Sequence, residues 1–258
     1  MNLQLSGRTV IITGGSKGIG LACARAFLLE GARVALFSRD PANLESARAA
    51  LGADVFTHAV DLSKAASADQ AFEAVETELG PVDVLVNSAG SARRHAPGEL
   101  NAAAWKQAMD GKFFTYVHAM DAVLPGMAAR RSGAIVNIIG IGGRVADSFH
   151  LAGGAANAAL MLATTGLAAA YAPRGVRING INPGMTKTGR VEDRLEVEAR
   201  ARGLALEDVR ARARDKIPAG RMAEPEEIAQ VALFLASPLS SYVTGAIIPM
   251  DGGSHPVI

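Results

Sequence analysis

The stretch Thr13-Gly14-Gly15-Ser16-Lys17-Gly18-Ile19-Gly20 decides how the rest of this chain is interpreted. An apolar run at residues 9–12 precedes it, and a helical pattern at residues 21–29 follows it. The glycines let the backbone turn tightly and approach a pyrophosphate, and the N-terminus of the following helix offers free N–H groups to the phosphates. Because strand, glycine turn and helix occur in this order, the stretch predicts a dinucleotide site rather than an ordinary turn.

The composition is typical of one large α/β domain. The chain has 258 residues, of which 49% are hydrophobic, and this is enough for one sizeable core. The net charge of +1 gives no argument for a nucleic-acid partner or an acidic membrane surface. The single cysteine, Cys23, excludes an intramolecular disulfide and favours the reducing cytoplasm, and the first strand begins too early for a signal peptide. We therefore expect a cytoplasmic protein with no nucleic-acid partner, no membrane association and no metal site.

Apolar strands alternate with helical patterns along almost the whole chain. This alternation predicts a Rossmann-like, doubly wound, mainly parallel seven-stranded sheet with helices on both faces. Such sheets bind ligands outside the carboxyl ends of their strands. No linker interrupts the pattern, so we expect residues 1–258 to form a single dinucleotide-binding domain. Strands are expected at residues 9–12, 33–38, 55–60, 82–87, 134–139, 176–181 and 246–250, and helices at residues 21–29, 42–51, 65–79, 105–128, 152–172 and 226–236.

Residues 155–172 form the longest weakly polar run of the chain. The run contains Asn157 and Thr164, so it predicts a buried helix of small residues rather than a membrane span. Its alanines and glycines let helices approach closely, so we expect two chains to pair through this helix. The last six residues, 253–258, end in apolar side chains and are expected to pack on a neighbouring chain.

Residues 186–219 break the alternation, because they contain no strand pattern and mix seven arginines with acidic residues. Their position predicts a helical substrate lid at about residues 186–220. The charges fit two interpretations, a solvated helical pair of mixed charge or a set of arginines that meets an anionic substrate. The arginines are Arg190, Arg194, Arg200, Arg202, Arg210, Arg212 and Arg214.

Five motifs in order resemble those of the short-chain dehydrogenase/reductase family over nearly the whole chain. Residues 13–20 are similar to its TGxxxGxG cofactor motif, and Asp61-Leu62 to the pair beside the adenine ring. Residues 87–90 are similar to its NNAG motif, with Ser88 in place of the second Asn. Residues 182–184 with Thr188 resemble the PG motif at the nicotinamide end, and residues 251–253 the closing DGG. The resemblance implies an NAD(P)-dependent oxidoreductase of a small carbonyl or alcohol substrate, commonly a homodimer or homotetramer.

The end of the second predicted strand indicates which cofactor is bound. An NAD site needs a carboxylate there for the ribose 2′-hydroxyl, but Ser38 occupies this place and Arg39 follows it. A guanidinium grips a 2′-phosphate, and Lys17 adds a second positive charge, so NADP(H) is predicted in preference to NAD(H). With the resemblance, the predicted cofactor-binding residues are Gly14, Ser16, Lys17, Gly18, Ile19, Gly20, Ser38, Arg39, Asp61, Leu62, Asn87, Ala89, Gly90, Asn157, Pro183, Gly184 and Thr188.

The catalytic set of the family is the part of the pattern that this sequence lacks. The family usually works with an Asn, a Ser and a Tyr-x-x-x-Lys pair. Counting from neighbouring landmarks places the Ser position on Gly140, the Tyr position on Gly153, the Lys position on Asn157 and the Asn position on Lys112. All four positions differ, so the resemblance alone does not carry the usual mechanism over.

Three nearby residues, His150, Lys112 and Asn157, are predicted to replace this set. His150 stands three residues before the vacant tyrosine position, and residues 150, 153 and 157 share one helical face if the helix starts early enough. An imidazole exchanges protons near neutral pH, and a lysine polarises a carbonyl oxygen or relays a proton. Asn157 is expected to hydrogen-bond the nicotinamide ribose. The alternatives are a locally bonded His150 and a Lys112 that only passes its apolar neighbours.

The leading hypothesis is an NADP(H)-dependent oxidoreductase that acts on a carbonyl/alcohol pair with a non-standard acid–base set. The alternative is a catalytically silent dinucleotide-binding sensor or partner subunit, which the loss of all four family residues favours. A third hypothesis is dehydration or isomerisation in the same cleft. No motif in the sequence names the substrate.

Overall fold

Seven parallel strands form one sheet in the computed structural model, which describes residues 2–90 and 92–255. The order β3-β2-β1-β4-β5-β6-β7 reverses between β1 and β4, and this switch point is where doubly wound sheets bind their ligands. The predicted fold class is therefore confirmed. The strands are β1 (Thr9–Thr13), β2 (Arg33–Ser38), β3 (Phe56–Ala59), β4 (Val84–Asn87), β5 (Gly133–Ile138), β6 (Val176–Pro183) and β7 (Ile247–Met250).

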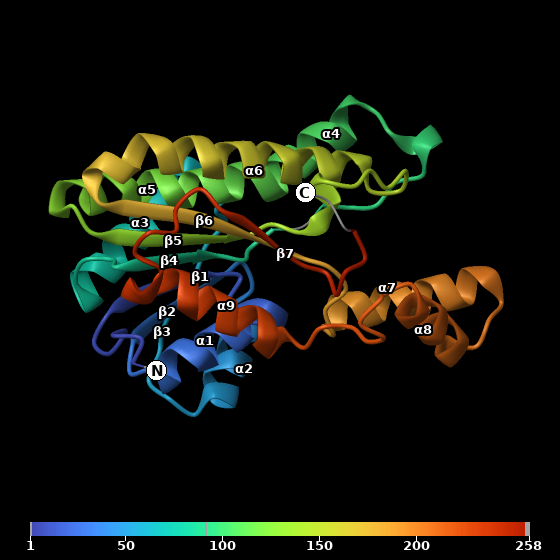
Figure 1. Cartoon of the computed structure of the whole chain (residues 1–258), viewed down its shortest axis with the longest axis horizontal. Helices are drawn as coiled ribbons and strands as arrows, with labels where there is room; N and C mark the ends of the chain where they lie inside the picture. Colours follow the sequence, from blue (N-terminus) through green and yellow to red (C-terminus); the bar gives the residue numbers. More distant parts are fainter. Residues whose placement is uncertain (1, 91, 256–258) are drawn as a thin grey trace.

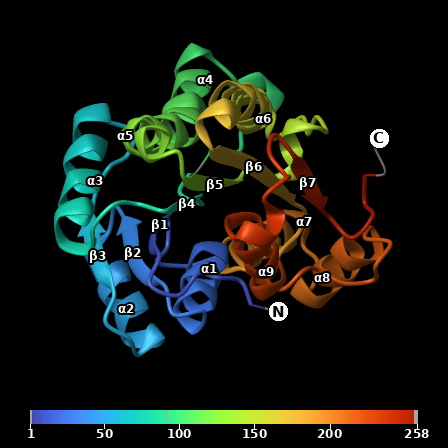
Figure 2. The same ribbon diagram turned by 60° about the vertical axis from the view of Figure 1, so that its left-hand side comes forward.

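Helices cover both faces of the sheet, as Figure 2 shows. One layer holds α1 (Gly18–Leu29), α2 (Pro41–Leu51) and α9 (Pro225–Ala236), and the other holds α3 (Ala65–Leu79), α5 (Thr115–Arg130) and α6 (Leu151–Tyr171). In β1, Val10 and Ile12 pack in the first layer's core while Ile11 packs in the second. Alternate residues of one strand thus face opposite cores, and this explains why the strands are apolar throughout.

The predicted helix at residues 105–128 is three segments instead of one. It consists of α4 (Ala102–Ala108), a π-helical turn η2 (Met109–Phe114) and α5. A π-turn widens the helix by one residue and often marks a functional position. Here it displaces the side chains of residues 109–114 relative to a regular helix, and Lys112 is one of them. The remaining short helices are η1 (Pro97–Glu99), η3 (Ile141–Gly143), η4 (Ala172–Arg174) and η5 (Pro238–Ser240).

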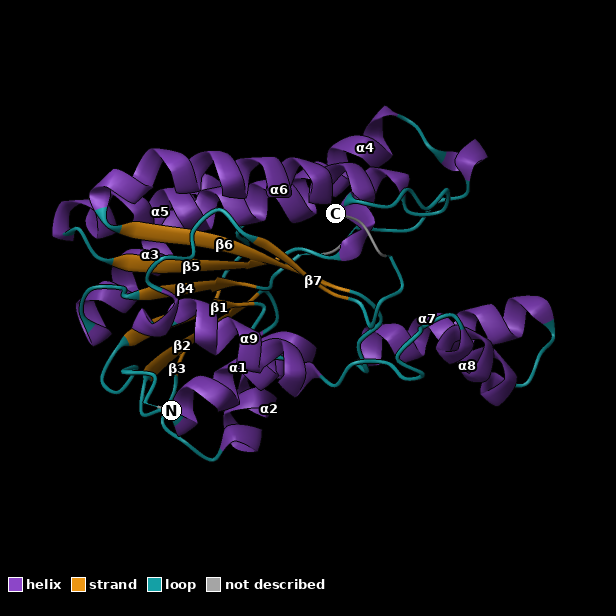
Figure 3. Cartoon of the chain, viewed as in Figure 1, coloured by secondary structure: helices purple, strands orange, loops and turns teal. Residues whose placement is uncertain are grey.

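Two helices, α7 (Gly189–Arg202) and α8 (Leu206–Asp215), occupy the region between β6 and α9 and project beyond the sheet (Figure 1). They have a small apolar core of their own, which includes Leu195, Val209 and Ile217. The strands run in one direction, so their carboxyl ends face the side on which α4 and this α7–α8 segment lie (Figure 3). The helical character predicted for the segment is confirmed.

The helix α6 is buried on one face only. By length and composition alone, Leu151–Arg174 is apolar enough to cross a membrane. In the structure, Leu160, Thr164 and Ala168 of α6 are buried in the domain, while Leu162 on another face is 76% exposed. The prediction of a buried small-residue helix therefore holds for the sheet-facing side of α6.

Candidate functional site

A cleft of about 1200 Å³ opens at the carboxyl ends of the strands. Its volume exceeds the roughly 300–1,000 Å³ of ordinary small-ligand pockets, so it suits an extended ligand. Residues from the β1–α1 turn, the end of β2, the β3–α3 turn, the end of β4, η2 and the start of α7 line it. Among them are the predicted residues Gly14, Ser16, Lys17, Gly18, Ile19, Ser38, Arg39, Asp61, Leu62, Ala89, Gly90, Pro183, Thr188 and Lys112.

At two positions of the glycine turn, Gly14 and Gly20, the structure leaves no room for a side chain. Gly14 has φ +64°, and a Cβ there would lie 2.7 Å from the Cα of Ala89. A Cβ on Gly20 would lie 2.3 Å from the carbonyl oxygen of Gly14. Gly20 does not itself line the cleft, but it lets α1 begin directly against the turn, so that the N-terminus of α1 faces the cleft.

A buried chain of hydrogen bonds joins the ends of β1, β4 and β5. The hydroxyl of Thr13 accepts from the backbone N–H groups of Ser88 and Ala89, both at 3.1 Å, and donates to Oδ1 of Asn87 at 3.2 Å. The amide of Asn87 in turn donates to Oδ1 of Asn137 at 3.0 Å. Asn87 is fully buried and does not line the cleft, so in this structure it fixes the strand ends and the turn after β4.

The end of the cleft beside β2 carries two cations, Lys17 and Arg39. The hydroxyl of Ser16 donates to that of Ser38 at 3.2 Å, which ties the glycine turn to the end of β2. The neighbouring carboxylate, Asp40, is occupied as the N-cap of α2, because it accepts from the N–H of Ala42 at 2.9 Å. The cations therefore face the cleft without a carboxylate in the position that an NAD site requires.

Asp61 lies in the adenine half of the predicted site and holds the turn after β3. Its Oδ1 accepts from the hydroxyl of Ser63 at 2.7 Å and from the N–H of Ser63 at 3.1 Å. The hydroxyl of Ser63 is the main reason that the pKa of Asp61 lies below its usual range. The second carboxylate oxygen takes no part in these bonds and remains an acceptor beside Leu62, on the cleft wall.

At the other end of the cleft, Lys112 directs its amino group into the wall. A Cβ on Gly90 would lie 2.7 Å from the Cδ of Lys112, so the lysine stem crosses directly over this glycine. The Nζ donates to the hydroxyl of Tyr116 at 3.2 Å and to the carbonyl of Ile138 at 3.4 Å. Burial, with a smaller contribution from the charge of Arg190, lowers the pKa of Lys112 to about 7. The amine is thus poised to gain or lose a proton near neutral pH.

His150 occupies the space above Gly153. A Cβ on Gly153 would lie 2.2 Å from the Cε1 of His150 and 2.8 Å from the Cβ of Ala92. The imidazole therefore takes the place that a side chain at 153 would need. Its Nδ1 is buried with no hydrogen-bond partner among the described residues. Burial, then the charge of Arg94, lowers the pKa of His150, although Asp147 opposes this shift.

The helix starts too late for residues 150, 153 and 157 to share one helical face. The helix α6 begins at Leu151, and His150 is its N-cap with φ −131° and ψ 27°. The ring reaches Gly153 because it folds back over the first turn, which two successive glycines leave open. Asn157 is buried, with its Nδ2 3.4 Å from where a Cβ of Gly140 would lie. Asn157, Gly184 and His150 do not line the 1200 Å³ cleft.

Comparison with known proteins identifies the family to which this chain belongs. A family model described as enoyl-(acyl carrier protein) reductase matches residues 14–255. Galactitol 2-dehydrogenase (L-tagatose-forming) of Cereibacter sphaeroides is 40% identical over 97% of this chain and 96% of its own. The chain belongs to the short-chain dehydrogenase/reductase family. It is an oxidoreductase of that type.

Two solved structures are similar to this short-chain dehydrogenase/reductase over almost their full length. L-sorbose reductase of Gluconobacter frateurii, complexed with NADPH and L-sorbose, is 30% identical with a TM-score of 0.94, and the match covers 100% of each chain. An NADPH-bound short chain oxidoreductase of Pseudomonas aeruginosa, described as containing an atypical catalytic center, is 36% identical with a TM-score of 0.90. That match covers 98% of this chain and 99% of the other.

The structure of this family member also shows groups that the sequence did not single out. Tyr116 lies one turn after Lys112 and donates to the carbonyl of Ile138 at 2.5 Å. The Lys-x-x-x-Tyr spacing was visible in the sequence, but this spacing alone does not distinguish a buried pair from two side chains on the surface of a helix. Arg94 and Asp147, 53 residues apart, form an ion pair between the loop after β4 and the loop before α6. No local signal in the sequence brings these two loops together.

Proposed function

We propose that the chain is an NADP(H)-dependent oxidoreductase that interconverts a carbonyl and an alcohol, with Lys112 as its proton donor and acceptor and His150 as a hydrogen-bond partner of the substrate oxygen. The observation that carries the proposal is the place of Lys112, whose stem crosses Gly90 in the cleft wall and whose amine lies beside Tyr116 and the carbonyl of Ile138, where burial lowers its pKa to about 7. A group that titrates at the working pH is the most effective proton donor and acceptor. Two NADPH-bound neighbours, one of them described as having an atypical catalytic center, support this assignment.

The cofactor fits the residues present. The Cβ-free turn at Gly14 and the N-terminus of α1 suit a pyrophosphate, and Arg39 and Lys17 suit a 2′-phosphate. Asp61 would accept from the adenine amino group through its open oxygen, and Asn157 would hold the ribose near Gly140. The bound cofactor supplies the hydride chemistry, and the protein supplies position and electrostatics. NAD(H) is the second choice.

The four usual catalytic positions of the family fall, by our alignment, on Gly140, Gly153, Asn157 and Lys112. Neither glycine offers a hydroxyl, so the proton for the substrate oxygen must come from elsewhere. In the reducing direction, the ammonium form of Lys112 donates it, and in the oxidising direction the neutral amine accepts it. Since the pKa of His150 is lowered, its imidazole is neutral at pH 7 and acts as a hydrogen-bond partner of the substrate oxygen.

Screening NADPH and NADH oxidation against a panel of ketones, aldehydes and ketoses tests the proposal. We expect turnover of at least one carbonyl class with NADPH in preference to NADH. The double variant Gly140→Ser with Gly153→Tyr would not restore the usual mechanism, because Asn157 cannot lower a tyrosine pKa as a lysine does. Tight NADPH binding with no turnover of any compound would instead support a catalytically silent dinucleotide-binding protein.

We further propose a single domain with α7 and α8 as a lid, assembled as a homodimer or homotetramer in the cytoplasm. Leu162, on the helix α6 through which we expect two chains to pair, is 76% exposed and would be covered by a second copy. Residues 256–258, also expected to pack on a neighbour, lie outside the described residues. Light scattering that shows a monomer at micromolar concentration would refute the assembly.

A further inference from the structure

We propose that the substrate carries an oxoanion, such as a carboxylate or phosphate, which binds Arg194 of α7 next to His150. This inference rests on the proposed oxidoreductase function and names the class of its substrate. It is carried by a half-buried cation, Arg194, for which the described residues supply no ion-pair partner.

Arg194 differs from the other arginines of residues 186–219. Five of the seven are exposed: Arg190, Arg200, Arg202, Arg212 and Arg214. Arg210 is half-buried, but its guanidinium donates to the carboxylate of Glu192 at 2.6 Å and 3.1 Å. Arg194 is half-buried too, yet no carboxylate of the described residues lies within ion-pair distance of it. The mixed-charge interpretation therefore fits most of this segment and fails at one residue.

The hydrogen bonds of Arg194 are incomplete. Its Nε is buried and has no hydrogen-bond partner among the described residues. Its Nη2 contacts the sulfur of Met185 at 3.5 Å, and sulfur is a weak acceptor. An arginine presents five N–H donors in a fixed fork and stays charged, so a half-buried guanidinium with these contacts is poorly compensated. An oxoanion is the ligand whose geometry fills such a fork with two parallel hydrogen bonds.

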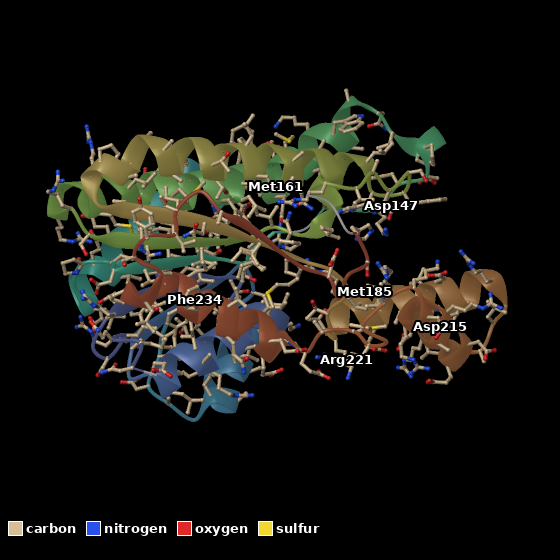
Figure 4. All side chains as sticks on the ribbon, in the orientation of Figure 1. Asp147, Met161, Met185, Asp215, Arg221 and Phe234 are labelled. Atoms are coloured by element: carbon tan, nitrogen blue, oxygen red, sulfur yellow. The ribbon has the colours of Figure 1, made fainter. Side chains whose placement is uncertain are left out.

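Arg194 does not line the 1200 Å³ cleft, but its contact and its charge connect it to the segment after β6 and to His150. Its contact Met185 follows Pro183-Gly184 at the end of β6, and Figure 4 shows Met185 at the base of the α7–α8 segment. Figure 4 also places Asp147 at the same end of the molecule, on the side of α6. Arg194 lies close enough to His150 for its charge to contribute to the lowered pKa of the imidazole. The two buried unpartnered nitrogens, Nε of Arg194 and Nδ1 of His150, thus belong to one neighbourhood.

Two carboxylates act on Arg194 from beyond ion-pair distance, Glu198 and Asp147, but each is held in an ion pair with another arginine. Arg94 and Asp147 form an ion pair, and Glu198 pairs with Arg202 at 3.2 Å. Arg194 remains, with Lys112 as a further cation near His150. A neutral polyol would satisfy some of the donors, but only an anion also neutralises the charge. The substrate we infer is therefore a hydroxy or oxo compound with its anionic group at Arg194 and its reacting oxygen at His150 and Lys112.

Matched pairs of anionic and neutral compounds test this inference. The probes are 2-oxobutanoate, 3-oxobutanoate and 4-oxopentanoate with their primary amides, and dihydroxyacetone phosphate with dihydroxyacetone. Binding is measured by calorimetry at pH 7, with and without NADP⁺, so that the readout does not require turnover. We expect at least one anion to bind wild type tighter than its neutral partner by about 10- to 100-fold, the range for a charge-assisted hydrogen bond.

Three variants assign this preference to one residue. Arg194→Met removes the charge at similar length and should abolish the preference for the anion while leaving the affinity for the neutral partner unchanged. Arg194→Lys keeps a charge and should retain part of the preference, which also guards against a folding defect in the first variant. Arg200→Met, an exposed arginine of the same helix, is the matched control and should behave as wild type.

The possible outcomes separate this inference from the proposed function. Equal binding of every anion and its neutral partner overturns the anionic substrate class, and so does a preference that survives in Arg194→Met. Either result leaves the oxidoreductase proposal standing if NADPH oxidation with a neutral carbonyl is observed. An Arg194-dependent anion preference without any turnover would support the anion site and count against the reaction.

Discussion

The two ends of the cleft are built from different parts of the chain. The cofactor end is made largely of backbone, since a Cβ on Gly14 or Gly20 would lie 2.7 Å or 2.3 Å from main-chain atoms. The catalytic end is made of side chains, and there the imidazole of His150 fills the space over Gly153. A backbone-built site tolerates little change, because each glycine is fixed by contacts on several sides. A side-chain-built site is open to replacement from a neighbouring position, and the imidazole of His150 lies where a side chain at position 153 would need to be.

The difference between the two ends predicts the largest effect when a side chain of the catalytic end is removed. Lys112→Met and His150→Ala should each lower carbonyl turnover by roughly 10²–10⁴-fold, because each removes a positioned proton-transfer or hydrogen-bonding group. NADPH affinity should change little, because neither side chain is among those proposed to hold the pyrophosphate or the 2′-phosphate. Steady-state kinetics and a fluorescence titration with NADPH measure the two quantities. Lys216→Met, an exposed lysine, is the control, and full activity in both active-site variants would refute the assigned roles.

Removing a cation from the cofactor end should weaken the binding of NADPH instead of lowering the rate of the chemical step. Arg39→Ala should weaken NADPH binding by about 10- to 100-fold, equivalent to roughly 1.5–3 kcal/mol for one charge-assisted contact, and should leave NADH binding nearly unchanged. Titrations of both cofactors measure this difference. Arg48→Ala, which removes an exposed arginine of α2, should alter neither affinity. Equal binding of NADPH and NADH by wild type would show that the cofactor assignment is wrong.

Adding one methyl group at Gly153 tests whether the ring of His150 must lie where it does. Gly153→Ala places a Cβ 2.2 Å from the present position of the His150 Cε1, so the ring has to move. We expect a loss of turnover on the order of 10-fold, smaller than the loss from removing the imidazole. In a His150→Ala background the same change should have a much smaller further effect, because only the 2.8 Å approach to the Cβ of Ala92 remains. Additive losses would separate Gly153 from His150. Gly166→Ala, in the same helix and in open space, is the control.

The same difference between the two ends explains what the sequence could predict. Backbone-built features follow from spacing, so the order of the strands and the glycine turn were predicted correctly, and most of the predicted cofactor residues line the cleft. Lys112 and His150 were found only by counting positions against the family pattern. The π-helical turn η2 was missed, because residues 105–128 have an ordinary helical pattern and the extra residue per turn leaves no compositional trace. The pairing of Arg94 with Asp147 depends on two loops meeting, which is set by tertiary structure alone.

The smallest effect we predict concerns how Tyr116 tunes Lys112. Since burial lowers the pKa of Lys112 from 10.5 to about 7, reduction should lose activity as pH rises through about 7, and oxidation should gain it. The hydroxyl of Tyr116 accepts from the Nζ of Lys112 at 3.2 Å and so stabilises the charged form. Tyr116→Phe removes this acceptor and should lower the pKa of Lys112 further, which moves the inflection of both pH profiles to lower pH.

A single hydrogen bond contributes about 0.5–1.5 kcal/mol, so the expected displacement of the inflection is about 0.4–1 pH unit. The pH dependence of kcat in both directions measures it, and Tyr171→Phe, a partly exposed tyrosine at the end of α6, should leave the profile unchanged. A merely structural Tyr116 would lower stability or kcat at every pH without displacing the inflection. A displacement to higher pH would contradict the prediction, because it would mean that the hydroxyl of Tyr116 stabilises the deprotonated form of the titrating group and not the ammonium of Lys112.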